Sequence, residues 1–131
     1  MDVKQALEFA HYLADRARPI ALRYFRDPLS IMRKTDESPV TVADREIEHT
    51  LRQVIQERHP SHGIIGEEYG GIPGKISWIL DPIDGTTSFI MGNPLFGTLI
   101  GFLSSDEPLV GLIDVPVMGE RWAGEGRATL F

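Results

Sequence analysis

One apolar run that stops at a proline constrains the fold of this chain more than any other feature. Residues 76–80 are typical of a buried strand, and they carry Asp81 to its end. Pro82 has no N–H group and a fixed φ, so we expect the strand ladder to end there. Asp84 follows three positions after Asp81, and Gly85 permits a tight bend or a close approach to a ligand. The sequence therefore predicts two carboxylates at the end of one strand.

The residues after this turn add hydrogen-bond donors to the two acids. A short helix can begin at Thr86, and its free N–H groups would face the same place as the carboxylates. Such an arrangement is suited to holding divalent metal ions against a phosphate. Asp-Pro and Asp-Gly are also ordinary turn dipeptides, so a plain turn is the alternative interpretation. Both stay open on these residues alone, although the full string is far less common than its parts.

The length and composition exclude several classes of protein. A chain of 131 residues fits one domain with a sizeable core. The net charge of −6 argues against nucleic acid or anionic lipid as the main partner. The absence of cysteine excludes disulfides, zinc–thiolate sites and a cysteine nucleophile. No apolar run approaches the roughly 18 residues that a membrane span needs, and the N-terminus lacks the apolar region of a signal peptide, so we expect a cytoplasmic protein.

Hydrophobic periodicity predicts two helices upstream of the motif. Apolar residues recur at helical spacing over 3–25, and we expect Pro19 to kink or break this helix. A second helix is predicted over 42–59, with Thr41 and Asp44 as a capping box at its start. On this pattern alone, Asp44 is a helix-start carboxylate rather than a catalytic one.

The rest of the sequence is typical of short strands. A strand over 62–69 would end in two acids, and Glu67 and Glu68 cannot both serve one site because neighbouring side chains in a strand face opposite sides. We expect residues 69–74 to form a flexible loop that could move over a site. Two helices followed by strands favour an α+β fold, with the helices packed on a mostly antiparallel sheet. The other predicted strands are residues 29–33, 95–103, 109–115, 121–123 and 128–131.

Three separated segments resemble one family of enzymes. Val40–Asp44, Gly66–Glu68 and Asp81–Thr86 are similar, in order and in residue type, to the inositol monophosphatase superfamily of magnesium-dependent, lithium-sensitive phosphatases. The resemblance implies the N-terminal half of a layered αβαβα sugar-phosphatase fold, with residues 1–131 as one metal-binding domain. In the family, the second half supplies a further metal-binding Asp and most of the side chains that select the substrate. We therefore expect the C-terminal domain to be absent from this chain.

The resemblance also implies a set of metal ligands. Glu67, Asp81 and Asp84 would bind Mg²⁺ through their carboxylates. The main-chain carbonyl of Ile83 would complete the set, and Glu68 would support it or point outward. Three carboxylates within about 4 Å of each other repel by roughly 4 kcal/mol per pair at an effective dielectric of 20, so they need cations among them. Ligands that are all oxygen suit Mg²⁺ rather than Zn²⁺.

By the same resemblance, the substrate would meet these residues and two further groups. The backbone N–H groups of Gly85 and Thr86 would hold phosphate oxygens, beside the carboxylates of Glu67 and Asp84. Asp44 and the Thr86 hydroxyl would together orient and deprotonate the attacking water, a role that the helix-cap spacing of Asp44 does not reveal. No covalent phospho-enzyme is required, which agrees with the absence of cysteine.

Two further segments, residues 92–100 and 119–122, look most like the histidinol-phosphate phosphatases of histidine biosynthesis. We therefore expect a Mg²⁺-dependent phosphomonoesterase that hydrolyses a small phosphorylated metabolite, histidinol phosphate, to histidinol by means of a metal-activated water. An inositol-1-monophosphatase is the alternative within the family. A truncated module that binds metal or phosphate without catalysis is the alternative of another class. We expect no nucleic-acid or membrane partner, and the resemblance makes a homodimer possible.

Overall fold

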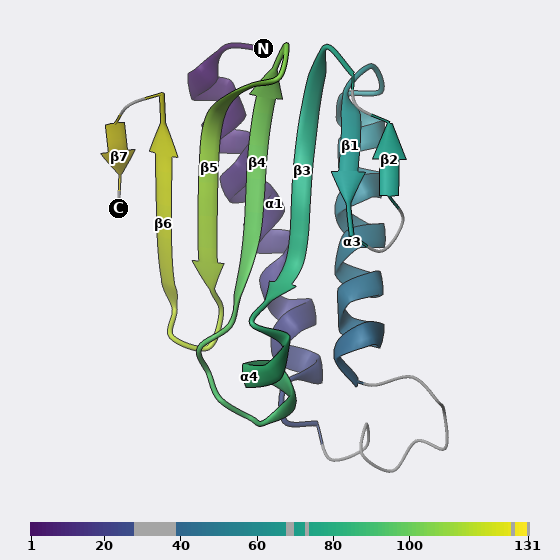
Figure 1. The fold of residues 1–131 in the computed structure, drawn as a ribbon, viewed down its shortest axis with the longest axis vertical. Helices are drawn as coiled ribbons and strands as arrows, with labels where there is room; N and C mark the ends of the chain where they lie inside the picture. Colours follow the sequence, from purple (N-terminus) through teal and green to yellow (C-terminus); the bar gives the residue numbers. More distant parts are fainter. Residues whose placement is uncertain (28–38, 68–69, 73, 127, 131) are drawn as a thin grey trace.

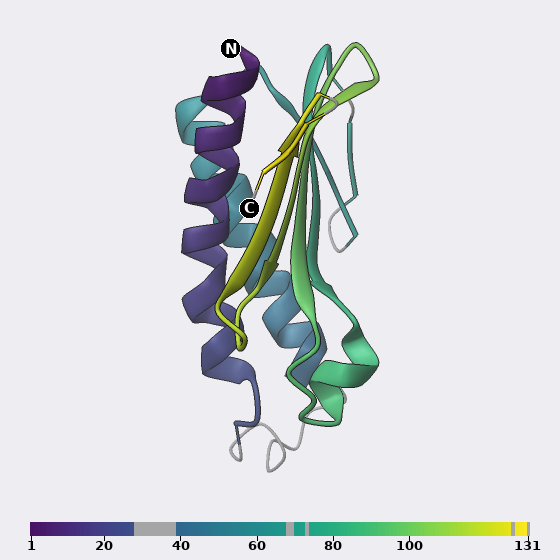
Figure 2. The same cartoon turned by 90° about the vertical axis from the view of Figure 1, so that its left-hand side faces the viewer.

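Among the described residues, two long helices cover one face of a β-sheet, and no long helix covers the other face. The computed structural model describes residues 1–27, 39–67, 70–72, 74–126 and 128–130. The helices α1 (Val3–Tyr24) and α3 (Pro39–Arg58) lie behind the sheet in Figure 1, and the turned view in Figure 2 shows the two layers. The strand predicted at residues 29–33 lies outside the described residues.

The strands of the described residues form one seven-stranded sheet in the order β2-β1-β3-β4-β5-β6-β7. β1 and β3 are parallel, and every other neighbouring pair is antiparallel. The predicted α+β architecture with a mostly antiparallel sheet is therefore confirmed. The carboxyl ends of β1 and β3 point to the same end of the molecule, where the short helix α4 (Thr86–Ile90) lies (Figure 1). The strands are β1 (Gly63–Gly66), β2 (Gly70–Ile72), β3 (Ile76–Asp84), β4 (Gly97–Ser104), β5 (Glu107–Val115), β6 (Glu120–Glu125) and β7 (Ala128–Leu130).

Helix α1 continues through Pro19 instead of breaking there. At its start, the Gln5 N–H donates to the Asp2 carboxylate at 2.7 Å, and the Asp2 N–H donates to the Gln5 side chain at 3.0 Å. Of the kink or break expected near Arg18, the break is wrong for a physical reason. Ala17 and Ala21 are completely buried on either side of the proline, so packing against the sheet outweighs the hydrogen bond that the proline removes.

Helix α3 begins at Pro39, three residues before the predicted start. Proline suits the first helical turn because its fixed φ is helical and its missing N–H is not needed there. Thr41 therefore lies inside the helix, and the predicted capping box of Thr41 and Asp44 is wrong. Asp44 lies in the second turn and is only 5% exposed. It is a buried helical residue, and not a helix cap.

The segment predicted as a flexible loop over 69–74 contains an edge strand. Gly70–Ile72 forms β2, which pairs antiparallel with β1 through the register Ile64↔Ile72 and Gly66↔Gly70. Gly71 between them has a φ of 153°, and a Cβ there would lie 1.7 Å from the Ile64 carbonyl oxygen. Only glycine allows the two backbones to approach this closely, so the glycines serve strand pairing here rather than flexibility.

The core lies between the helices and the covered face of the sheet. Trp78 of β3 is fully buried, with its ring centroid 5.2 Å from that of Phe9 in α1 and 4.8 Å from that of Phe102 in β4. Its indole N–H donates to His62 Nδ1 at 3.1 Å, so the buried polar group has a partner.

None of the described helices combines the length and the hydropathy that a membrane crossing requires.

Candidate functional site

Strand β3 carries the two central acids past the proline. It continues to Asp84, so the prediction that the strand ends at Asp81 is wrong. In the ladder with β4, Asp81 pairs with Leu99 and Asp84 pairs with Gly97. Three steps along β3 therefore oppose two steps along β4, which is a β-bulge. A bulge tolerates Pro82 because the missing N–H is not required for the ladder at that point.

The bulge directs its residues to different environments. Asp81 borders the open face of the sheet, Pro82 and Ile83 are buried, and Asp84 is exposed. The buried Pro82 carbonyl accepts a hydrogen bond of 2.8 Å from the hydroxyl of Thr98 on β4. The two acids are therefore accessible, while the backbone that joins them is enclosed.

Glu67 is brought beside Asp81 by the parallel pairing of β1 and β3. The register aligns Gly66, the last residue of β1, with Leu80, so Glu67 and Asp81 are the next residues of two neighbouring chains. The negative charge of Glu67 acts on Asp81, which agrees with this placement. Glu67 is exposed. Glu68, predicted to support the site or point outward, lies outside the described residues.

The other two acids act electrostatically on Asp81. Burial raises the pKa of Asp81 to about 6, and the negative charges of Glu67 and Asp84 contribute to the same shift. One oxygen of Asp81, Oδ1, is buried and accepts no hydrogen bond from a described residue. A buried acceptor without a donor is costly, and a cation would satisfy it. Asp81 is thus the centre of the acidic group.

The donor set fits a hard divalent cation in kind, since it consists of carboxylate oxygens and includes an unsatisfied buried one. Within the described ranges, however, no three acidic or histidine side chains are gathered closely enough to hold a metal ion by themselves. Glu67, Asp81 and Asp84 are therefore electrostatic neighbours and not a closed cage.

Gly85 turns the chain from β3 into helix α4. Its backbone is left-handed, with φ 88° and ψ 47°, and a Cβ would lie 3.2 Å from the Leu95 carbonyl oxygen. Both facts favour glycine here. The helix begins at Thr86, as predicted, and the first N–H groups of a helix have no carbonyl partner within it. Gly85 and Thr86 are exposed, so these donors are accessible beside the acids.

Helix α4 has only five residues and depends on tertiary contacts for its position. Phe89 is buried, and its ring lies 5.6 Å from that of Phe25 and 4.9 Å from that of Phe96. The Arg26 guanidinium donates two hydrogen bonds to the Gly92 carbonyl, at 2.9 and 2.6 Å. The end of α1 thus holds the short helix and the turn after it.

Asp44 approaches the same end of the molecule from α3, which contacts both β3 and α4. One turn further along, Glu48 is fully buried and accepts a hydrogen bond of 3.0 Å from Arg52 Nε. The Glu48 carboxylate lies under Gly66, where an added Cβ would be 2.4 Å from its carboxyl carbon. Glu48 therefore packs directly against the residue that precedes Glu67.

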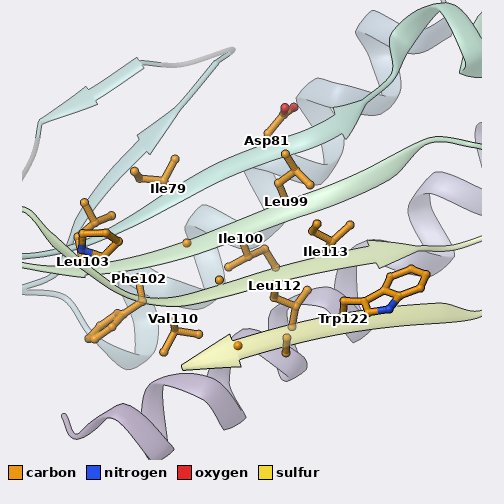
Figure 3. A pocket seen from close by; sticks show the side chains of 15 residues that line it. Ile79, Asp81, Leu99, Ile100, Phe102, Leu103, Val110, Leu112, Ile113 and Trp122 are labelled. Carbon is orange, nitrogen blue, oxygen red and sulfur yellow. The ribbon is translucent and has the colours of Figure 1, made fainter. Parts of the chain in front are cut away.

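A groove of about 520 Å³ runs over the open face of the sheet, across β3, β4, β5 and β6. Figure 3 shows Asp81 among the side chains that line it, with Ile79, Ile113 and Trp122 from different strands. Asp81 is the one charged residue among the described residues of this lining. Ile113 is 46% exposed and Trp122 is 36% exposed. The surface next to the acidic group is therefore apolar.

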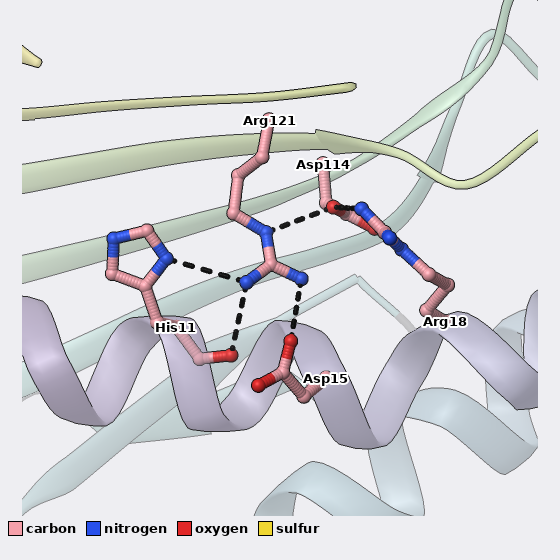
Figure 4. Close-up of polar contacts among 5 residues, drawn as sticks. All are labelled: His11, Asp15, Arg18, Asp114 and Arg121. Carbon is pink, nitrogen blue, oxygen red and sulfur yellow. Dashed lines mark hydrogen bonds and ion pairs between the residues drawn. The ribbon is translucent and has the colours of Figure 1, made fainter. Parts of the chain in front are cut away.

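Asp114 of β5 belongs to a different cluster, a group of ion pairs and hydrogen bonds on the covered face of the sheet. It is completely buried and accepts hydrogen bonds from Arg18 of α1, at 3.0 Å from Nε, and from Arg121 of β6, at 2.9 Å from Nε (Figure 4). Arg121 also pairs with Asp15 at 2.8 Å and donates to the His11 carbonyl at 3.5 Å. This cluster joins the first helix to two strands.

The sequence prediction missed two buried polar residues near the site, Glu48 and Thr98. Glu48 follows Asp44 by four positions, and this helical spacing could have placed both on one face. Thr98 lies in the apolar strand predicted over 95–103, and its hydroxyl among apolar neighbours is the one feature of the sequence that could have singled it out. Neither signal by itself indicates what the side chain contacts.

The comparisons with known proteins agree with this architecture. The sequence profile of the Inositol monophosphatase family matches residues 2–129. The bifunctional phosphatase IMPL2, chloroplastic, of Arabidopsis thaliana is 48% identical over 122 residues, which cover 89% of this chain and 35% of that protein. A histidinol-phosphatase of Chlorobaculum parvum is 41% identical over 128 residues, covering 95% of this chain and 49% of that protein. A solved structure of an inositol monophosphatase from Zymomonas mobilis superposes with a TM-score of 0.83 at 42% identity, covering 95% of this chain and 49% of the other.

The chain spans about half the length, or less, of these relatives. The match nevertheless extends over nearly all of the chain, from the first helix to the last strand, and includes the acidic group and α4. Sequence and structure therefore agree on one conclusion: the chain belongs to the inositol monophosphatase family.

Proposed function

We propose that this chain carries the metal-binding and phosphate-binding part of a Mg²⁺-dependent phosphomonoesterase. The observation that carries the proposal is Asp81, whose buried oxygen lacks a donor among the described residues and whose pKa is raised by burial and by Glu67 and Asp84. An acid in this environment is a strong candidate for a functional group. The accessible N–H groups at the start of α4 supply a place for an anion next to it.

Each residue then has a chemical role. Glu67, Asp81 and Asp84 would hold Mg²⁺, together with the Ile83 carbonyl. Bound Mg²⁺ supplies charge neutralisation of the phosphate and a lower pKa for a coordinated water.

The other groups act on the substrate and the water. The N–H groups of Gly85 and Thr86 donate to phosphate oxygens and fix the orientation of the ester. The Thr86 hydroxyl and the buried carboxylate of Asp44 orient the attacking water and take up its proton.

We further propose histidinol phosphate as the substrate. A relative named histidinol-phosphatase supports this choice, and a similar structure described as an inositol monophosphatase supports inositol 1-phosphate as the second candidate. Both are small phosphorylated alcohols, so the acidic group and α4 would act on either in the same way. Side chains outside the acidic group and α4 would have to distinguish them.

The test is phosphate release by the purified full-length protein. We expect Mg²⁺-dependent release from histidinol phosphate at a higher kcat/KM than from inositol 1-phosphate. The matched control is Asp81→Asn, which keeps the side-chain shape and should abolish Mg²⁺-dependent turnover. Release from neither substrate, together with Mg²⁺ binding, would favour the non-catalytic module over the enzyme.

Two expectations about the setting of the protein stay predictions. One is a cytoplasmic location, for which one relative named chloroplastic offers a contrast. The other is a homodimer without a nucleic-acid or membrane partner, which the analytical ultracentrifugation of the complete protein would test.

A further inference from the structure

The β-bulge of β3 leaves a short piece of backbone without ladder partners. Asp81 and Asp84 are paired with residues of β4, whereas Pro82 and Ile83 between them are not. Both unpaired residues are buried. A buried carbonyl needs a hydrogen-bond donor, and the ladder does not provide one for Pro82.

Thr98 supplies the missing donor. Its hydroxyl lies 2.8 Å from the Pro82 carbonyl oxygen, and its side chain is buried with only 1% of the residue exposed. Among the residues that the structure describes, no other side chain donates a hydrogen bond to the backbone of residues 81–84. This one contact therefore fixes the peptide plane that follows Pro82.

The orientation of that peptide plane bears on three proposed ligands. Pro82 follows Asp81 directly, and the Pro82 carbonyl belongs to the peptide bond between Pro82 and Ile83. The carbonyl of Ile83 itself is the proposed backbone ligand. Asp84 comes next along the chain. A rotation of the plane would move the Ile83 carbonyl and change the direction in which Asp84 leaves the strand.

On the side away from β3, Thr98 is aligned with a residue of β5. It pairs with Asp114 in the register of β4 and β5. Asp114 is completely buried and accepts hydrogen bonds from Arg18 of α1 and Arg121 of β6. The support for the bulge thus extends from the first helix through β5 and β4, and it lies entirely on the covered face of the sheet.

We propose that Thr98 is a positioning residue for the metal site, because its hydroxyl sets the backbone from which Asp81 and Asp84 leave β3. The inference rests on the proposed function, since it concerns the affinity of these acids for Mg²⁺. Residues that orient metal ligands without contacting the metal typically change its affinity by about 10–100-fold when altered. Thr98 belongs to this class.

The test is the Mg²⁺ affinity of the complete protein, measured by isothermal titration calorimetry with the metal alone. Thr98→Val keeps the shape of the side chain and removes the donor, and we expect it to weaken Mg²⁺ binding by about tenfold. Thr98→Ser keeps the donor, and we expect this variant to retain the Mg²⁺ affinity of the original protein. If Thr98→Val does not fold, Thr98→Ala compared with Thr98→Ser isolates the same hydroxyl.

Ser77 offers a matched control in β3, at the end of that strand farthest from the bulge. Its buried hydroxyl donates to the Gly74 carbonyl at 3.0 Å, as Thr98 does to that of Pro82. Ser77→Ala should lower stability in urea without changing the Mg²⁺ affinity, which separates a loss of stability from a loss of positioning.

The outcomes distinguish this inference from the proposed function. Mg²⁺ binding by the original protein and by Thr98→Val with equal affinity would overturn the role of Thr98 alone. Equal weakening by Thr98→Val and Ser77→Ala would overturn it too, because the effect would then follow stability. No Mg²⁺ binding by the original protein would overturn the proposed function and this inference with it.

Discussion

The buried carboxylate of Asp114 allows a stability prediction whose size follows from the structure. The Asp114 side chain is 1% exposed, and it is paired with Arg18 and Arg121, whose side chains are 30% and 16% exposed. The hydrogen bond to Asp114 is the main cause that raises the pKa of Arg18. Asp114→Asn would keep the shape of the side chain and remove its charge, so Arg18 would lose this ionic partner and Arg121 would keep the exposed Asp15.

The cost can be estimated from the burial of the partners. Removing one member of a buried ion pair lowers the free energy of unfolding by about 3–5 kcal/mol. The asparagine oxygen still accepts one hydrogen bond, so we expect the lower end, about 3 kcal/mol. Asp15 gives the contrast, since it pairs with the same Arg121 but is 65% exposed. Asp15→Asn should cost less than about 1 kcal/mol.

Urea denaturation followed by tryptophan fluorescence measures both variants, because Trp78 and Trp122 lie in the same sheet. The slope of the free energy against urea should stay constant, so that the midpoint alone reports the difference. The reasoning is wrong if Asp114→Asn costs no more than Asp15→Asn. A triple replacement of Arg18, Asp114 and Arg121 by apolar residues of similar volume should recover most of the loss.

Three further predictions concern the site itself. Gly85→Ala should lower the free energy of unfolding in urea by about 1–2 kcal/mol, because alanine is strained at a left-handed φ. It should also weaken the binding of inorganic phosphate, measured by calorimetry. Phosphate binding at the original affinity would contradict this. Gly66→Ala should displace the Glu48 carboxylate, at a cost of about 1–3 kcal/mol, and weaken Mg²⁺ binding, whereas Gly111→Ala, with nothing within 4 Å of the added Cβ, should do neither. The pKa of Asp81 is raised from 3.8 to about 6, so its contribution to stability without metal is present below pH 3.8 and lost as the pH rises through about 6. Mg²⁺ binds the ionised carboxylate, so the affinity of the protein for Mg²⁺ should fall as the pH drops through about 6. If this affinity does not change between pH 7 and pH 5, Asp81 is excluded as a ligand.

Much of the fold could be predicted from hydrophobic periodicity, because burial of one face decides both helices and antiparallel strands. The strands predicted over 95–103 and 109–115 correspond to Gly97–Ser104 and Glu107–Val115. Both lie next to each other in the chain and in the sheet, so their pattern depends on local partners. The short helix at Thr86 was predicted for the same reason, since Gly85 determines its start locally.

The errors occurred where a distant partner decides the local structure. Pro82 does not end its strand, because Thr98 of another strand takes over the hydrogen bonding of the bulge. Gly70–Ile72 forms a strand, because the neighbouring strand admits the close approach of Gly71. A local rule for proline or glycine states what the residue cannot do alone, and it contains no information about the partner.

The candidate site was predicted in part for a similar reason. The motif in the sequence indicates that Asp81 and Asp84 share one strand end. That Glu67 lies beside Asp81 follows only from the parallel register of β1 and β3, which a period of two residues does not reveal. The roles of these acids stay predictions, and the electrostatic coupling of Asp81 to both neighbours supports them.

The polar residues on the covered face explain how an open acidic group can be held in place. Glu48, Thr98 and Asp114 are all buried among apolar residues, and burying a polar group costs free energy unless a partner satisfies it. Each contacts or pairs with backbone that leads to the site: Gly66 before Glu67, the bulge before Asp84, and the strand that carries Thr98. Hydrogen bonds define a backbone position more narrowly than apolar packing does, because they require a direction as well as a distance. We infer that these side chains fix the direction of the backbone that leads to the three acids of like charge.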